Sequence, residues 1–127
     1  MNEINLKIKK ALKKHSSKFY QKKSLNILNF LLETNFNYIF SWKGVPVIQL
    51  PTDLLVIQEL INKNKPDVII ECGLAHGGSI LFYESVLNSY KKKYKIFGID
   101  IKISSLTKIN IKKNARVRFI SLIRQFF

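Results

Sequence analysis

The sequence predicts an α/β fold in which short parallel strands alternate with helices, preceded by a basic helical N-terminal segment. Two runs rich in β-branched and aromatic residues, 68–72 and 94–99, flank a helical pattern, and a third short run covers 117–120. Strands that alternate with helices are typical of parallel sheets. The order β-α-β-α-β corresponds to one half of a doubly wound sheet.

Composition limits the class of protein. The chain has 127 residues, a net charge of +14, 46% hydrophobic residues and a single cysteine, Cys72. That length suits one domain, and the apolar fraction is too high for intrinsic disorder. The lone cysteine excludes a disulfide scaffold. The sequence also lacks any run of about 18 apolar residues, the length that would predict a membrane span. Since no secretory signal is visible either, we expect a cytoplasmic protein.

The positive charge is concentrated at the two ends of the chain. Residues 1–23 carry eight lysines and one glutamate, and residues 91–127 carry eight lysines, three arginines and one aspartate. A basic surface attracts nucleic acid, anionic lipid or phosphorylated metabolites, and lysines also solvate exposed faces without any partner. Because no nucleic-acid-binding motif is recognisable, the charge predicts no specific nucleic-acid partner.

The N-terminal segment is expected to be helical. Apolar residues recur at steps of three and four between lysines over residues 4–32, with an interruption at Ser16-Ser17. Such an amphipathic helix either makes peripheral contact with a membrane surface or docks on the protein's own core. We therefore expect a basic segment, 1–37, and a sheet domain, 38–127.

The first part of the sheet domain is predicted from its glycine and proline residues and from a candidate helix cap. Residues 34–52 contain scattered Gly and Pro residues and predict irregular structure. Thr52 or Asp53 is the expected N-cap of a helix over 54–62, because either side chain can accept from the first free amides. Pro66 is expected to end that helix.

The strand Val68–Cys72 is almost wholly apolar rather than alternating, which predicts burial on both faces. Cys72 is accordingly expected to be a small buried hydrophobe. The remaining expected elements are a helix over 80–90, a strand over 94–99 closed by Asp100, a weak helix over 106–113 and a strand over 117–120.

The loop after this strand has the pattern Glu71-x-Gly73-x-x-x-Gly77-Gly78-Ser79. Gly73 allows a sharp turn off the strand, and Gly77 and Gly78 are expected to let a ligand approach the main chain. The free amides of the helix start near Ser79 suit a carboxylate or another anion.

Other glycine loops fit this pattern less well. A P-loop needs a lysine after its last glycine, where this chain has Ser79, and a dinucleotide loop needs glycine where this chain has Ala75. Asp100 ends the neighbouring strand, where a carboxylate can accept both ribose hydroxyls of a nucleoside. Glu71 is then expected near a cationic amino or sulfonium group of the ligand.

Three residues also have plain structural interpretations. Glu71 can cap the loop amides, and His76 has no evident partner acid or base. Trp42 is either a packing anchor, the commoner role, or a platform for a substrate.

With its flanks, the loop resembles a known family. The motifs Trp42-x-Gly44 and Pro51-x-Asp53-Leu54 precede the glycine loop, and together they resemble the cephalosporin hydroxylase family over about residues 38–103. That family includes rhamnosyl O-methyltransferases. The resemblance implies a Rossmann-like, S-adenosylmethionine (SAM)-dependent methyltransferase that acts on a hydroxyl of a small molecule or sugar, in lipid or polysaccharide biosynthesis, with magnesium.

The resemblance carries over only to matching positions. The implied cofactor-binding residues are Glu71, Gly73, Gly77, Gly78, Ser79 and Asp100. The family's metal-binding acids lie further downstream, and no Asp, Glu or His follows Asp100 in this chain. We therefore predict no metal ligand and assign no catalytic residue.

The predicted sheet is incomplete. Strands 68–72, 94–99 and 117–120 would leave 68–72 at an edge, although its sequence is typical of a central strand. We therefore expect a truncated chain that is inactive alone, with a second copy or a partner chain covering Val68–Cys72. The alternatives are a non-catalytic nucleoside-binding module that needs a partner, and a basic protein that binds membrane or nucleic-acid surfaces.

Overall fold

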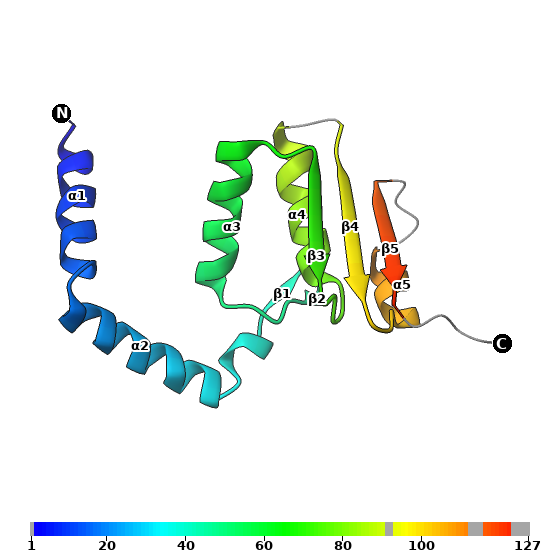
Figure 1. Cartoon of the computed structure of the whole chain (residues 1–127), viewed down its shortest axis with the longest axis horizontal. Helices are drawn as coiled ribbons and strands as arrows, with labels where there is room; N and C mark the ends of the chain where they lie inside the picture. The colour runs from blue at the N-terminus through cyan, green and yellow to red at the C-terminus, as the bar shows by residue number, and fades with distance from the viewer. Residues whose placement is uncertain (1, 91–92, 112–115, 123–127) are drawn as a thin grey trace. The chain divides into compact units, whose positions relative to one another are not determined.

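The computed structural model describes residues 2–90, 93–111 and 116–122 (Figure 1). The chain divides into two compact units, residues 1–36 and 37–127. In chain order the elements are α1 (Glu3–His15), α2 (Lys18–Glu33), η1 (Phe36–Tyr38), β1 (Ser41–Trp42), β2 (Val45–Pro46), α3 (Pro51–Asn64), β3 (Val68–Cys72), α4 (Gly78–Tyr90), β4 (Lys95–Asp100), α5 (Ser105–Ile111) and β5 (Val117–Ser121).

The first unit consists of α1 and α2. Asn2 caps α1, since its side-chain oxygen accepts from the N–H of Ile4 at 3.4 Å. The predicted break between the helices is confirmed: Ser17 has extended backbone angles (φ −75°, ψ 142°) and forms the N-cap of α2. Neither helix contains a buried residue. In the described parts of the chain, no helix is long and apolar enough to cross a membrane.

The second unit opens with a hairpin of β1 and β2, where the sequence predicted irregular structure. The two strands pair antiparallel around Lys43 and Gly44. Both turn residues have positive φ angles, 50° and 78°, which give a two-residue turn the twist that the strands require. Each strand has only two residues, which is too short for an alternating pattern, so the sequence could not predict the hairpin.

Helix α3 begins earlier than predicted. Its N-cap is Leu50 and Pro51 occupies the first helical position, so the prediction of Thr52 or Asp53 as the N-cap was wrong. The fixed φ of proline suits this position, where its missing N–H would have no helical partner. At the other end Lys65 adopts a left-handed conformation, directly before the proline that was expected to end the helix.

The three longer strands form a parallel sheet in the order β3-β4-β5. The register places Ile69 beside Ile96 and Ile96 beside Val117. Helix α4 connects the first pair of strands and α5 connects the second. The predicted α/β class and the order β-α-β-α-β are confirmed, with β3 at one edge of the described sheet.

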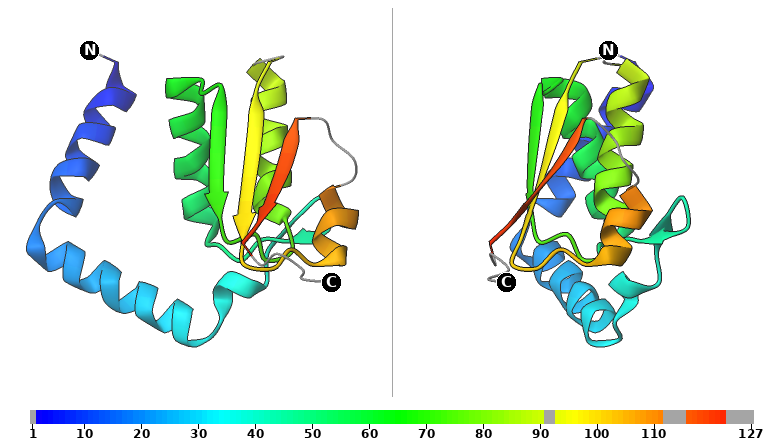
Figure 2. Two further views of the ribbon diagram at one scale, coloured as in Figure 1. Left: turned by 45° about the vertical axis from the view of Figure 1, so that its right-hand side comes forward. Right: turned by 90° about the vertical axis from the view of Figure 1, so that its right-hand side faces the viewer.

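Helices α3, α4 and α5 all cover the same face of this sheet (Figure 2, right view). The core lies between that face and α4, where Ile80, Leu87 and Ile96 are fully buried. Ile69 and Phe119 pack against this core from the flanking strands. Every second strand residue therefore points at the helices.

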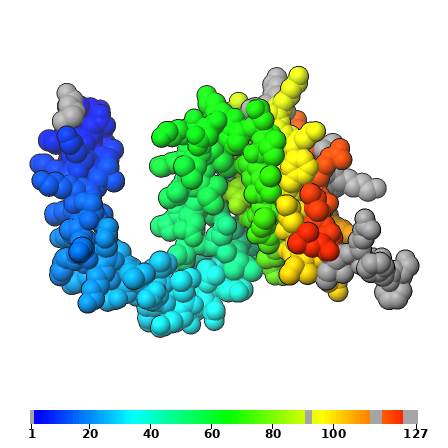
Figure 3. Space-filling model, in the orientation of Figure 1, coloured from blue at the N-terminus to red at the C-terminus, as the bar shows by residue number. Residues whose placement is uncertain are grey.

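The opposite face of the sheet is bare within the described residues of the second unit. Ile70 is 63% exposed and Ile120 is 44% exposed, and Cys72 is exposed. Figure 3 views the molecule from this side, and atoms of β3, β4 and β5 form its visible surface. The predictions that Val68–Cys72 is buried on both faces and that Cys72 is buried were therefore wrong, because no described element of the second unit covers this face.

Candidate functional site

The site lies at the carboxyl ends of β3 and β4, where Asp100 holds the glycine loop. The N–H of Leu74 donates to Asp100 Oδ2 at 2.8 Å, and the N–H of Gly73 donates to the carbonyl of Ile99 at 2.8 Å. Asp100 Oδ1 accepts at 3.4 Å from the N–H of Lys102. Asp100 is half-exposed, and a carboxylate has lone pairs for further donors. Capping of a loop amide, which the sequence suggested for Glu71, is performed by Asp100.

The three glycines of the loop serve different purposes. Gly73 has a φ of +86°, and no atom lies within 4 Å of the place a Cβ would occupy, so it is a turn glycine. A Cβ on Gly77 would lie 2.7 Å from Ile111 Cδ1, and one on Gly78 would lie 2.7 Å from Val47 Cγ2. Neither position has room for a side chain, and Gly78 lines the cavity described next, so the expectation that a ligand approaches the main chain there stays a prediction.

A cavity of about 280 Å³ lies between the loop, the segment after β2 and the start of α4. Four of the six predicted site residues line it, while Gly77 packs behind the loop and Asp100 bonds to the lining residue Leu74. The lining residues are Pro46, Val47, Ile48, Gln49, Glu71, Gly73, Leu74, Ala75, Gly78 and Ser79.

Glu71 is the most perturbed acid of this cavity. Its Oε1 accepts from the Tyr83 hydroxyl at 3.4 Å, and its Oε2 is buried with no hydrogen-bond partner in the described structure. Burial raises the pKa of Glu71, while the hydroxyls of Ser79 and Tyr83 offset part of that rise. Burial and the adjacent charge of Glu71 raise the pKa of Tyr83 to about 12. A cation in the cavity would stabilise the ionised carboxylate.

Gln49 belongs to the site although the sequence analysis did not single it out. Its Oε1 is also buried without a hydrogen-bond partner among the described residues, and Gln49 and Glu71 line the same cavity. Two unsatisfied buried acceptors at one cavity suit a ligand that donates several hydrogen bonds, such as an ammonium group. A lone amide within the apolar run 47–50 was the available signal in the sequence.

Trp42 and His76 lie outside this chemistry. The indole N–H of Trp42 donates to Ser85 Oγ at 3.0 Å, and its ring meets Phe82 edge to face at a centroid distance of 4.9 Å. Trp42 is therefore a packing anchor, as predicted. His76 is exposed, and its backbone carbonyl accepts from Asn110 Nδ2 at 3.0 Å.

The acids of the site come from two strands, Glu71 from β3 and Asp100 from β4. Within residues 2–90, 93–111 and 116–122, no three His, Cys, Asp or Glu side chains are grouped closely enough to hold a metal ion. Magnesium therefore finds no ligand set among the described residues, whereas the unsatisfied acceptors of the cavity fit an ammonium-bearing ligand.

A glycine turn, a helix start and a strand-end acid lie at the carboxyl edge of the parallel sheet, an arrangement typical of nucleotide-binding α/β proteins. A family profile described as Rhamnosyl O-methyltransferase/CmcI matches residues 34–125. The chain belongs to this family, and the resemblance stated from the sequence is confirmed.

One curated relative and two solved structures are similar to parts of the chain. Rhamnosyl O-methyltransferase from Mycobacterium leprae (strain TN) is 30% identical over 61 residues, which are 48% of this chain and 27% of that protein. A solved CmcI structure described with SAH has a TM-score of 0.52 at 17% identity and aligns with 65% of this chain and 42% of its own. One described with Mg-SAM has a TM-score of 0.53 at 18% identity, covering 66% and 36%. The chain thus spans well under half of each relative.

Proposed function

We propose that the cavity beside the loop after β3 binds SAM, and that the chain takes part in methyl transfer to a hydroxyl of a small molecule or sugar. The observation that carries this proposal is the pair of unsatisfied buried acceptors, Glu71 Oε2 and Gln49 Oε1, at one cavity. Family membership supports the choice of SAM over other ligands with an ammonium group.

Each polar part of SAM has a complementary group here. The α-ammonium group donates to Glu71 and Gln49, where it also neutralises the buried carboxylate. The carboxylate of SAM meets the first-turn amides of α4 beside Ser79, at the positive end of the helix dipole. Asp100 accepts from the ribose hydroxyls while it keeps the loop in place.

When bound, SAM supplies an electrophilic methyl group on its sulfonium. The residues described here bind and orient it: Gly73 turns the chain away from the cavity, and Glu71 fixes the amino end. Because the described residues offer no set of metal ligands, we propose no magnesium role for them.

We further propose that a second copy or a partner chain covers β3 when the protein acts. Strand β3 has only β4 as a neighbour among the described strands, and Ile70 within β3 is 63% exposed. Exposed strand edges and apolar faces favour association. The acceptor would then bind to parts of the fold outside this sheet.

Calorimetric titration of the full chain with SAM and with adenosine tests the proposal. We expect SAM to bind to the parent chain. Glu71→Gln should weaken the affinity for SAM by about tenfold or more. The affinity for adenosine should stay unchanged in that variant, because adenosine lacks the amino-acid part. Asp100→Asn is expected to weaken the binding of both SAM and adenosine. Glu59→Gln, the same change at an exposed position of α3, is the matched control.

The proposal fails if SAM does not bind, or if Glu71→Gln and Glu59→Gln behave alike. A methyl-transfer assay with the same preparation separates two kinds of function. Binding without transfer would identify a nucleoside-binding module that needs its partner for catalysis.

A further inference from the structure

Helix α1 carries an apolar stripe that no described residue of its own unit covers. Ile4, Ile8, Ala11 and Leu12 recur at steps of three and four, which places them on one side of the helix. The side chains of Ile4, Ile8 and Leu12 are 53%, 50% and 66% exposed, respectively. Exposure of every large apolar residue of the stripe means that α1 has an interaction surface that its own unit does not use.

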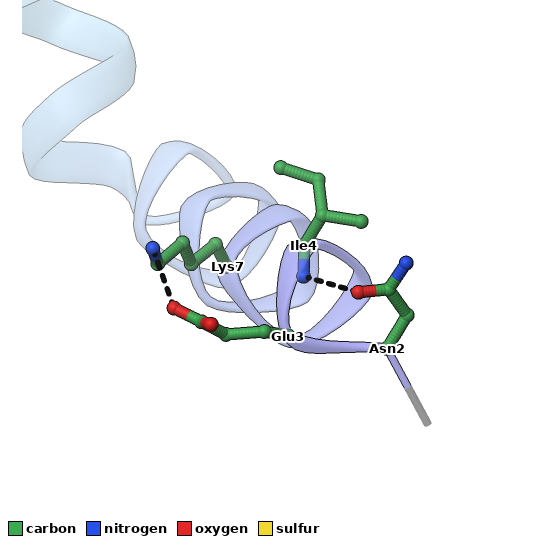
Figure 4. Close-up of polar contacts among 4 residues, drawn as sticks. All are labelled: Asn2, Glu3, Ile4 and Lys7. Atoms are coloured by element: carbon green, nitrogen blue, oxygen red, sulfur yellow. Dashed lines mark hydrogen bonds and ion pairs between the residues drawn. The ribbon is translucent and has the colours of Figure 1, made fainter.

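The remainder of α1 is strongly basic. Five lysines follow the rest of the helix circumference: Lys7, Lys9, Lys10, Lys13 and Lys14. Glu3 is the only acid in residues 1–32, and it pairs with one lysine, Lys7, at 2.7 Å (Figure 4). The sequence of this segment therefore leaves most of its lysine charge without a carboxylate of its own.

A second feature of the same unit brings lysine side chains together. Lys10, Lys13, Lys14 and Tyr20 line an open hollow between α1 and α2. Lysine and tyrosine side chains both carry donors suited to a phosphate oxygen. Tyrosine is also typical of the boundary between water and lipid, because its ring is apolar and its end is polar.

We propose that α1 lies flat on an anionic membrane surface, with its stripe in the boundary between headgroups and acyl chains. Its lysines then contact the lipid phosphates. A nucleic acid accounts for the lysines but not for an exposed apolar stripe. Residues 1–36 also contain no arginine, the side chain that most often reads bases directly. This surface is independent of the SAM cavity.

The test is sedimentation of the full chain with vesicles of phosphatidylcholine, with and without phosphatidylserine. We expect binding only with phosphatidylserine, and a loss of binding as salt rises. Leu12→Gln should weaken binding by about tenfold or more. Leu6→Gln, the same change on the lysine side of α1, should alter it by less than about twofold.

Two further variants locate the contact. Lys9→Gln combined with Lys13→Gln should lower binding to the anionic vesicles by about 25-fold, since each lysine near such a surface contributes about fivefold. Ile70→Gln, on the bare face of the sheet, should leave binding unchanged.

Three results would overturn the proposal. One is equal binding to both kinds of vesicle, and another is an equal loss in Leu12→Gln and Leu6→Gln. The third is binding to a DNA duplex, but to neither vesicle, that survives Leu12→Gln. That result would assign the lysines to nucleic acid.

Discussion

The two faces of the β3-β4-β5 sheet have similar apolar sequences and opposite surroundings. On one face Ile96 is fully buried beneath α4, and on the other Ile70 is 63% exposed. Both residues are isoleucines on neighbouring strands of the same sheet. The difference therefore comes from what covers each face, and not from the strands themselves.

The burial of an apolar strand depends on which elements cover each of its faces. A strand that is hydrophobic at every position predicts cover on both sides, yet the described chain supplies helices for one side only. The bare side is thus a surface whose sequence is typical of a protein interior. The ligand cavity lies at the carboxyl end of the same sheet, between the glycine loop, the segment after β2 and the start of α4.

The largest expected effect separates the two faces directly. Ile96→Ala should lower the free energy of unfolding by about 2–5 kcal/mol, because it opens a cavity in the packed core. Ile70→Ala should lower it by less than about 1 kcal/mol, because this side chain is mostly in water. Chemical denaturation of both variants measures the contrast, and equal losses would show that the bare face is covered in solution.

The loop glycines give the next contrast. Gly78→Ala should lower the free energy of unfolding by about 1–3 kcal/mol, since its Cβ would press on the Pro46 carbonyl and Val47. Gly73→Ala has room for its Cβ, and the positive φ alone should cost about 1–2 kcal/mol. Thermal unfolding compares them. A Gly78→Ala variant as stable as the parent would contradict the described packing of α4 on the segment after β2.

The burial of Glu71 predicts that the stability of the fold depends on pH. Its folded-state pKa lies above its ordinary value of 4.5 because of burial. Its contribution to stability is therefore fully present below pH 4.5 and is lost as the pH rises through the raised pKa. Glu71→Gln should be more stable than the parent at neutral pH without SAM, and the advantage should vanish in acid.

Melting temperatures across this pH range, with Glu59→Gln as the exposed control, check that prediction. The same Glu71→Gln change is expected to weaken SAM binding, so stability and binding should move in opposite directions. A loss of stability at neutral pH would mean that the carboxylate is better satisfied than the described contacts allow.

The smallest effect concerns reactivity rather than stability. Cys72 is exposed on the bare face, so a thiol reagent should modify it in the native chain as fast as in the unfolded chain, within about tenfold. Slow modification that speeds up on dilution would identify a second copy on this face. Modification should leave the melting temperature of the chain nearly unchanged.

Much of the fold was predictable because its signals are local. The glycine loop, the apolar strands and the break at Ser17 each depend on a few neighbouring residues. The hairpin around Gly44 and the start of α3 at Pro51 were missed, since two-residue strands have no period and proline at a helix start resembles a helix stop.

The candidate site was only partly predictable, for a different reason. Glu71 and Asp100 follow from strand ends, which sequence reveals. Gln49 joins them through tertiary packing of a segment far from the loop, and a lone amide in an apolar run does not by itself assign it to the site. The roles of Gly77 and Gly78 likewise depend on which side chains pack against them.

The central claim is that SAM binds in the cavity beside the loop after β3. Amide chemical-shift mapping of the full chain by ¹⁵N nuclear magnetic resonance, during titration with SAM, tests it most directly. We expect shifts at residues 47–49, 71–79 and 100–102, with none along α1. Saturable binding whose shifts fall on the bare sheet face or on α1, or no shifts at any concentration, would contradict it.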